Sequence, residues 1–123
     1  MKIGEESIIQ IQVCEWLNQC TDLPFYHFAN EGKRTYANAS ILKRMGLKAG
    51  VSDLFIPRGT DNFHGLFLEL KSKNGKLTDT QLNFMNEMIK EGFGAHVAYS
   101  SSEAIQIIKA FYSLQPEPQQ QSL

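Results

Sequence analysis

Three side chains near the middle of the chain have the types and spacing needed for phosphodiester hydrolysis. Asp53 lies in an apolar, strand-like stretch at residues 51–56, and Glu69 and Lys71 lie at the end of a second one at residues 66–70. Because strand side chains alternate between faces, Glu69 and Lys71 should point the same way, and a neighbouring strand would bring Asp53 beside them. Two carboxylates are hard oxygen ligands for Mg²⁺, and an adjacent amine can contact or activate the attacking water.

The residues around Glu69 argue against an ordinary surface ion pair. A Glu-x-Lys triplet on a strand is common and usually lies at a solvated edge. Here Leu66, Phe67, Leu68 and Leu70 make the strand apolar on both sides, which is typical of a strand in the middle of a covered sheet. A buried charge is costly unless it is paired or bound to metal, so the triplet favours a functional site.

The elements that must position these residues follow from hydrophobic periodicity and turn signals. A turn-rich segment at residues 57–65 predicts that the two stretches form a β-hairpin. Thr78 followed by Gln81 is the signature of a capping box that opens a helix ending near Gly92, and Ser101 or Ser102 is expected to cap the last helix. Helices are predicted over residues 5–19, 37–45, 78–91 and 102–112, and strands over 23–28, 51–56, 66–70 and 95–99.

This order of elements predicts an α/β fold, a mixed central β-sheet flanked by α-helices. The helix from Thr78 should cross over the sheet, so that strand 95–99 lies parallel to strand 66–70. A chain of 123 residues can bury one core, and residues 1–113 are expected to form a single domain. Residues 114–123, with two prolines and four glutamines, are expected to form a disordered tail.

Composition limits the class of protein. No apolar stretch of eighteen residues and no signal peptide is present, so we expect no membrane partner and a soluble, cytoplasmic protein. Cys14 and Cys20 are interpreted as reduced thiols on one helix, and His27, His64 and His96 as structural residues, because no orienting partner is identifiable for them.

The charge is unevenly distributed, although the formal net charge is only −1. Residues 33–76 hold nine Lys or Arg and three acids, an excess of six positive charges around the predicted site. Such a local excess predicts a nucleic-acid-binding face, whereas the simpler interpretation of any one lysine is solubilising charge. Few aromatic residues lie among these cations, which favours contact with the phosphate backbone over base stacking.

An ordered set of motifs runs through the chain: Glu6, Gln10 and Trp16, then Asn30, Gly32 and Arg34, then residues 50–54 (Gly-Val-Ser-Asp-Leu), then residues 69–71 (Glu-Leu-Lys), and then Leu77, Thr78 and Gln81. This set resembles the VRR-NUC branch of the PD-(D/E)xK nucleases, and the resemblance extends from about Glu5 to Tyr112. It implies a restriction-endonuclease-like core around the mixed sheet. The Asp and Glu-x-Lys core alone is weakly specific, whereas the ordered set is much more so.

The resemblance, together with the residue types, implies the following roles. Asp53 and Glu69, with the Leu70 backbone carbonyl as a third oxygen, are expected to hold Mg²⁺ or Mn²⁺. Lys71 would activate the water or stabilise charge.

Two further positions have open alternatives. Glu6, with Glu5 as the fallback, either completes the site or merely favours the helix dipole. Gln81 either closes the capping box, lies near the phosphate, or does both. The residues predicted to contact nucleic acid are Asn30, Lys33, Arg34, Lys48, Lys73 and Lys76.

The leading hypothesis is therefore a metal-dependent endonuclease that cuts DNA by direct attack of water. Free-standing domains of this family are similar to viral or phage proteins that form homodimers and resolve four-way (Holliday) junctions, and two symmetric cuts fit a dimer. The sequence leaves open a flap or other structure-selective nuclease, a nickase of duplex, an RNA-directed or single-strand nuclease, and a nucleic-acid-binding module without cleavage.

Overall fold

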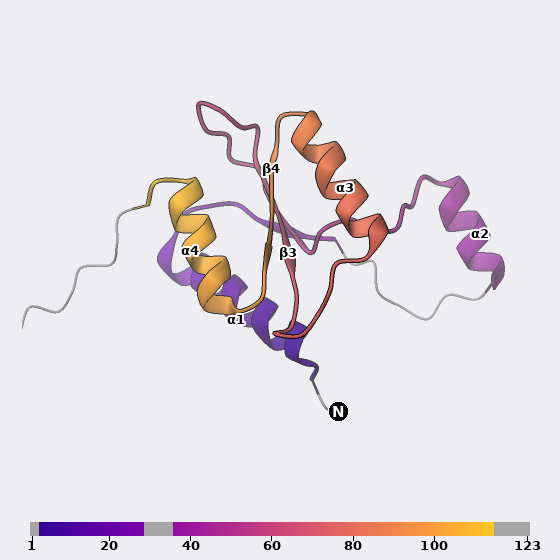
Figure 1. Ribbon diagram of the computed structural model, residues 1–123, viewed down its shortest axis with the longest axis horizontal. Helices are drawn as coiled ribbons and strands as arrows, with labels where there is room; N and C mark the ends of the chain where they lie inside the picture. The colour runs from indigo at the N-terminus through magenta and orange to yellow at the C-terminus, as the bar shows by residue number, and fades with distance from the viewer. Residues whose placement is uncertain (1–2, 29–35, 115–123) are drawn as a thin grey trace, which may run out of the picture.

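The computed structural model describes residues 3–28 and 36–114, in which a four-stranded sheet lies between helices (Figure 1). The strand order is β1-β2-β3-β4. Strands β1 (Tyr26–His27), β2 (Leu54–Ile56) and β3 (Leu66–Leu70) are antiparallel, and β4 (Gly94–Ala98) is parallel to β3. The helices are α1 (Glu5–Cys20), α2 (Tyr36–Arg44), α3 (Asp79–Lys90) and α4 (Ser101–Phe111). None of these described helices is long and apolar enough to span a membrane.

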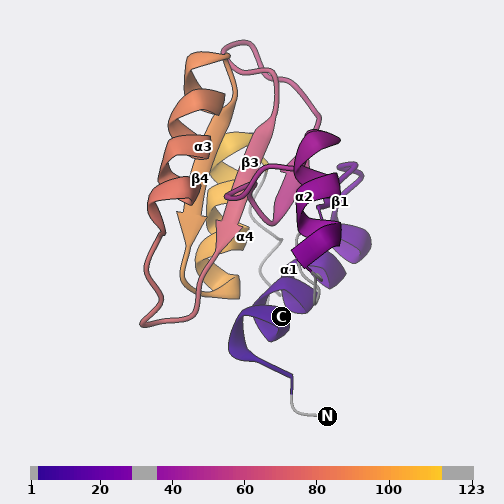
Figure 2. The same cartoon turned by 90° about the vertical axis from the view of Figure 1, so that its right-hand side faces the viewer.

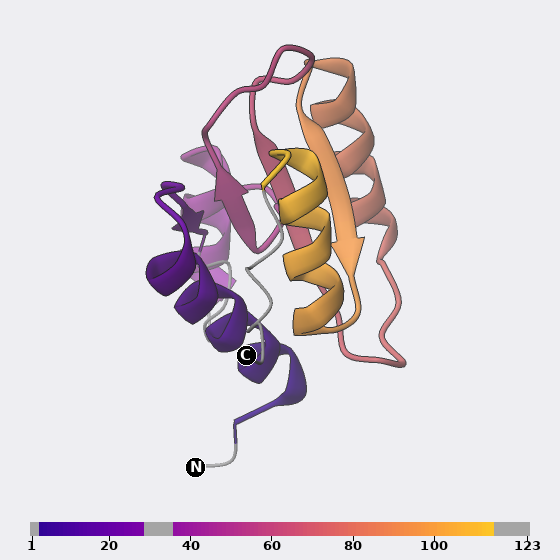
Figure 3. The same ribbon diagram turned by 90° about the vertical axis from the view of Figure 1, so that its left-hand side faces the viewer.

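Strand β3 forms the centre of the core, and all five of its residues are buried. Leu66, Leu68 and Leu70 pack on the side of α1 and α4, whereas Phe67 packs with Met85 of α3 on the other. Figures 1 and 3 show α4 and α3 on opposite sides of β3 and β4. Each fully buried leucine contributes about 2 kcal/mol of hydrophobic free energy, so this strand is firmly held.

The predicted α/β fold is confirmed, including the hairpin, the crossover through α3 and the parallel pairing of β3 with β4. The capping box of Thr78 and Gln81 is present. Several helix and strand bounds differ by one residue from the prediction, and three other local predictions also differ from the structure. Strand β1 contains only residues 26–27, β2 begins at Leu54 rather than at residue 51, and Ser100, not Ser101 or Ser102, caps α4 by accepting a hydrogen bond from the Glu103 N–H at 3.0 Å.

The two ends of the predicted domain can be compared only where the structure describes them. Leu114, assigned above to the tail, still packs against the core, and residues 115–123 lie outside the described part of the chain. Both cysteines lie on α1 as free thiols.

Gly50 connects the α2 region to the strand that carries the predicted site. Its φ of +91° is in the left-handed region, and a Cβ there would collide with the backbone of Thr80. Only glycine lets the two backbones approach so closely without strain. The segment entering β2 is thereby held against the first turn of α3.

Candidate active site

Asp53 and Glu69 lie side by side because of the register of the hairpin. Leu54 pairs with Leu68, so the next position along the ladder places Asp53 opposite Glu69. Both side chains then point to the face covered by α3, and they are close enough for the Asp53 carboxylate to raise the pKa of Glu69. The site lies at the carboxyl ends of β3 and β4, which Figure 2 shows at the same end of the sheet, near the first turns of α1.

Where β2 begins, the side chain of Asp53 takes the place of a backbone hydrogen bond between β2 and β3. Its Oδ2 accepts a hydrogen bond of 2.7 Å from the backbone N–H of Leu70. This bond ends the β2–β3 pairing, which explains why β2 is shorter than predicted. In an extended strand the N–H and C=O of one residue point to the same side, so the Leu70 carbonyl also faces Asp53.

Glu69 is 3% exposed, and only one of its two carboxylate oxygens accepts a hydrogen bond from a described residue. Its Oε1 accepts a 3.1 Å hydrogen bond from Nε2 of Gln81 and lies 3.9 Å from Nζ of Lys71. Its Oε2 is buried and has no hydrogen-bond partner among the described residues. Since an unsatisfied buried carboxylate oxygen is costly, this atom calls for either a proton or a cation.

Burial dominates the electrostatics of the two acids. Burial first and the adjacent Asp53 carboxylate second raise the pKa of Glu69 to about 8, and Lys71 opposes the rise. Burial likewise raises the pKa of Asp53, against the effect of the Leu70 hydrogen bond. One ammonium group therefore does not balance the two carboxylates, and a divalent cation would.

Lys71 is the third member of this cluster. It is 8% exposed, and its backbone N–H donates to the Ala98 carbonyl at 2.9 Å, which extends the pairing with β4. The side chain lies on the same face as that of Glu69, as the alternation predicts. The predicted convergence of Asp53, Glu69 and Lys71 is thus present, while their roles remain predictions.

Gln81 closes the predicted capping box and also contacts the acidic pair, while its place near the phosphate stays a prediction. Its Oε1 accepts from the Thr78 N–H at 2.9 Å, closing the capping box, while its Nε2 donates to Glu69. The N-terminal turn of α3 is therefore joined directly to the carboxylate pair.

Glu6 lies near the pair without joining it. Its Oε1 accepts from the Ser72 N–H at 3.4 Å, and its charge contributes to the raised pKa of Glu69 after burial and Asp53. Within residues 3–28 and 36–114, no three His, Cys, Asp or Glu side chains are grouped closely enough to hold a metal ion. Direct ligation by Glu6 is therefore not part of this geometry, and a contact through water stays a prediction.

The donor set fits the predicted metal. Asp53, Glu69 and the Leu70 carbonyl offer only hard oxygen atoms, and the unpartnered Oε2 of Glu69 is a free acceptor among them. Mg²⁺ and Mn²⁺ prefer such ligands and retain several waters when two carboxylates bind them.

His27 makes a contact with the backbone of Asp53 that the sequence did not predict. Its Nδ1 lies 2.8 Å from the backbone carbonyl of Asp53, because β1 pairs His27 with Leu54. No sequence spacing indicates this contact, since 26 residues separate the two. His27 thus helps to hold the backbone at Asp53.

The predicted nucleic-acid contacts fall into three groups. Lys73 and Lys76 are exposed on the loop after β3, at the same end of the sheet as the site. Lys48 is exposed on the segment between α2 and Gly50. Asn30, Lys33 and Arg34 lie outside the residues that the structure describes.

Comparisons with known proteins agree with this arrangement. The family model described as the VRR-NUC domain matches residues 3–102. A solved structure titled "VRR_NUC domain protein" is similar with a TM-score of 0.78 and 28% sequence identity, and the match covers 93% of each chain. No curated protein matches the sequence significantly.

Proposed function

The chain belongs to the VRR-NUC domain family, and from this premise we propose that it is a metal-dependent, structure-selective DNA endonuclease that resolves four-way junctions as a homodimer. That it carries a nuclease-type domain follows from the family; the metal, the substrate and the dimer are the proposal. The observation that carries the metal dependence is the buried Glu69 Oε2, which lacks a donor beside a second carboxylate.

Each residue of the site has a role in the proposed reaction. Asp53, Glu69 and the Leu70 carbonyl would hold Mg²⁺ or Mn²⁺, which supplies Lewis-acid stabilisation of charge on the phosphate. Asp53 is oriented for this by its hydrogen bond from Leu70, and Glu69 by Gln81.

Lys71 carries the rest of the proposed chemistry. Its ammonium group, held next to Glu69, stabilises negative charge on the phosphate and positions the attacking water. The water attacks phosphorus directly as the P–O bond to one sugar oxygen breaks, and that oxygen leaves as a hydroxyl after taking a proton from solvent, so no covalent enzyme intermediate forms.

The proposed preference for branched DNA follows from the kind of contact available. Lysines at the site end of the sheet, including Lys48, Lys73 and Lys76, bind phosphates, and phosphate contacts carry no base information. Selection then depends on the shape of the DNA. Two symmetric cuts across a junction need two sites, which supports a homodimer.

Cleavage of a synthetic four-way junction with and without Mg²⁺ or Mn²⁺ tests the proposal. Asp53→Ala and Lys71→Ala should bind the junction without cutting it, whereas the exposed controls Asp61→Ala and Lys90→Ala should cut like the wild type. Cleavage by Asp53→Ala, or metal-independent cleavage, would contradict the metal site. Equal cutting of junctions, flaps and linear duplexes would refute junction preference, and binding without any cleavage would favour a binding module. Light scattering after size exclusion tests the dimer.

A further inference from the structure

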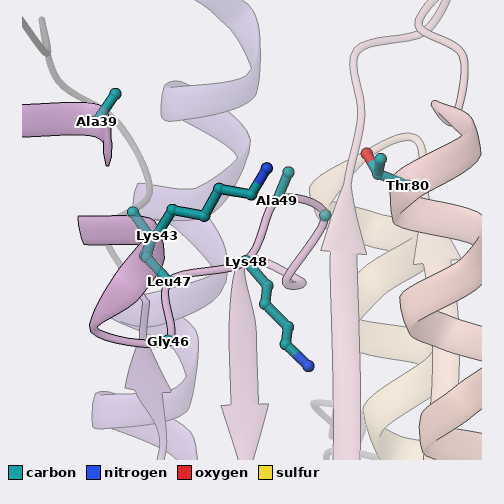
Figure 4. Close-up of a pocket in the computed structure, with 8 residues that line it drawn as sticks. Ala39, Lys43, Gly46, Leu47, Lys48, Ala49 and Thr80 are labelled. Atoms are coloured by element: carbon teal, nitrogen blue, oxygen red, sulfur yellow. The ribbon is translucent and has the colours of Figure 1, made fainter. Parts of the chain in front are cut away.

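A hollow of about 740 Å³ lies between α2 and the N-terminal turn of α3. Its walls include Ala39 and Lys43 from α2, Lys48 and Gly50 from the following segment, and Thr80 from α3. Figure 4 shows the side chain of Lys43 extending from α2 towards Ala49, with Lys48 on the segment that follows α2. The volume is within the range of about 300–1,000 Å³ that is usual for small-ligand sites.

The hollow adjoins the candidate active site. Gly50 is in close contact with the backbone of Thr80 and Gln81, and the side chain of Gln81 donates to Glu69. One residue of α3 therefore separates the wall of the hollow from the carboxylate pair. The hollow is therefore adjacent to the place where a substrate would bind at the carboxylate pair.

The charge of the hollow is positive. Both lysines are exposed, and in the part of the chain that the structure describes, no acidic residue lines the walls and neither lysine lies within 4.0 Å of a carboxylate. The first turn of α3 is already capped by Thr78 and Gln81, so the lysines, rather than the helix end, are the groups available to an anion.

The rest of the lining indicates which part of a nucleic acid would fit. Besides the lysines, the walls consist of alanine, glycine and leucine residues with one threonine hydroxyl. Among the described residues, the lining includes no aromatic ring on which a base could stack, and almost no group that could read a base edge. Small apolar walls suit the sugar, and lysines suit the phosphates.

We infer that this hollow binds the sugar–phosphate backbone of the substrate strand next to the phosphate that is cut, with Lys43 and Lys48 as its phosphate contacts. The inference rests on the proposed nuclease function. It adds Lys43 and α2 to the binding surface and defines the direction in which the strand leaves the site, past Gly50 towards α2.

Binding of a fluorescently labelled four-way junction in EDTA, measured by anisotropy over about 50–200 mM salt, tests the inference without cleavage. Lys43→Ala and Lys48→Ala are each compared with Lys90→Ala, an exposed lysine at the far end of α3. Losing one phosphate contact should reduce the slope of log K against log salt by about 0.9, which amounts to about eightfold weaker binding near 0.1 M salt. Lys48→Arg should keep wild-type binding.

A second variant separates the hollow from general surface charge. Ala39→Trp fills the hollow from α2 while leaving both lysines in place, and it should also weaken binding. Melting temperatures equal to that of the wild type show that each variant folds.

The inference would be overturned if both lysine variants kept the wild-type slope of log K against log salt. It would also be overturned if Lys90→Ala weakened binding as much as they do. If the wild type still cuts DNA in that case, the proposed function stands without it. Full binding by Ala39→Trp would show that the lysines contact DNA outside the hollow and would also overturn it. If the wild type binds no DNA, the inference and the proposed function fail together.

Discussion

Replacing Glu69 by glutamine should make the protein more stable at pH 8 in the absence of divalent cations. Burial and the adjacent Asp53 carboxylate raise the pKa of Glu69 from its ordinary 4.5 to about 8. The folded state therefore keeps a proton that the unfolded state loses above pH 4.5. This contribution to stability is fully present below pH 4.5 and is lost progressively as the pH rises towards 8.

The size of the effect follows from the shift. One pKa unit corresponds to about 1.4 kcal/mol, so the change of about 3.5 units sets an upper value of about 5 kcal/mol. Because the carboxylate pair lies at an end of the sheet and beside the Lys71 ammonium group, solvent and this charge screen part of that value, which leaves about 3 kcal/mol. Asp53, whose pKa burial also raises, adds in the same direction. For a chain of this size, 3 kcal/mol corresponds to a change of roughly 10 °C in Tm.

Thermal unfolding between pH 5 and pH 8 in EDTA measures this prediction. The Tm of the wild type should fall as the pH rises across this range. The Tm of Glu69→Gln should fall much less, because the uncharged amide can donate to Asp53 and still accept from Gln81. Adding Mg²⁺ at pH 8 should raise the Tm of the wild type more than that of the variant, since a ligand of the folded state stabilises it. A flat wild-type profile, or an equal fall in the variant, would refute the reasoning.

Three further predictions concern the surroundings of the site. Gln81→Ala removes the acceptor for the Thr78 N–H and the donor to Glu69, so it should lower the free energy of unfolding in urea by about 1–2 kcal/mol and slow single-turnover cleavage. Gln81→Glu should keep the cap and still slow cleavage, because its carboxylate repels Glu69. Cleavage at the wild-type rate by both variants would contradict this role. Gly50→Ala should cost about 1–3 kcal/mol more than Gly46→Ala in the same urea assay, because both glycines have positive φ but only Gly50 has backbone against it; equal losses would show that φ strain alone matters. Tyr112→Phe should lose about 1 kcal/mol in urea unfolding, because the hydroxyl donates to the Arg58 carbonyl at 2.9 Å, and should leave cleavage unchanged, because this contact is at the other end of the sheet; slower cleavage would refute that separation.

Predictions from local pattern agree best with the structure. The apolar run at residues 66–70 predicted a strand buried on both faces, and alternation predicted Glu69 and Lys71 on one face. The capping box of Thr78 and Gln81 was likewise readable, because its bonds join residues three apart.

Predictions that depend on partners elsewhere were less accurate. Strand β1 is two residues long because its extent depends on where β2 can pair with it, and β2 stops where the Asp53 side chain takes the Leu70 N–H. His27 was set aside as structural without its partner, the Asp53 carbonyl, being foreseen.

The sequence by itself determined the type of each main element, the alternation that points Glu69 and Lys71 to one face, and the motif order of the VRR-NUC family, since these depend on residues close together in the chain. Only the tertiary structure decided the strand register that sets Asp53 opposite Glu69, the bond from Gln81 to that carboxylate, the place of Glu6 one step away, and the hollow that Lys43 and Lys48 line beside the site. These contacts depend on strand register and helix docking, which burial of the whole core decides and no short stretch of sequence contains.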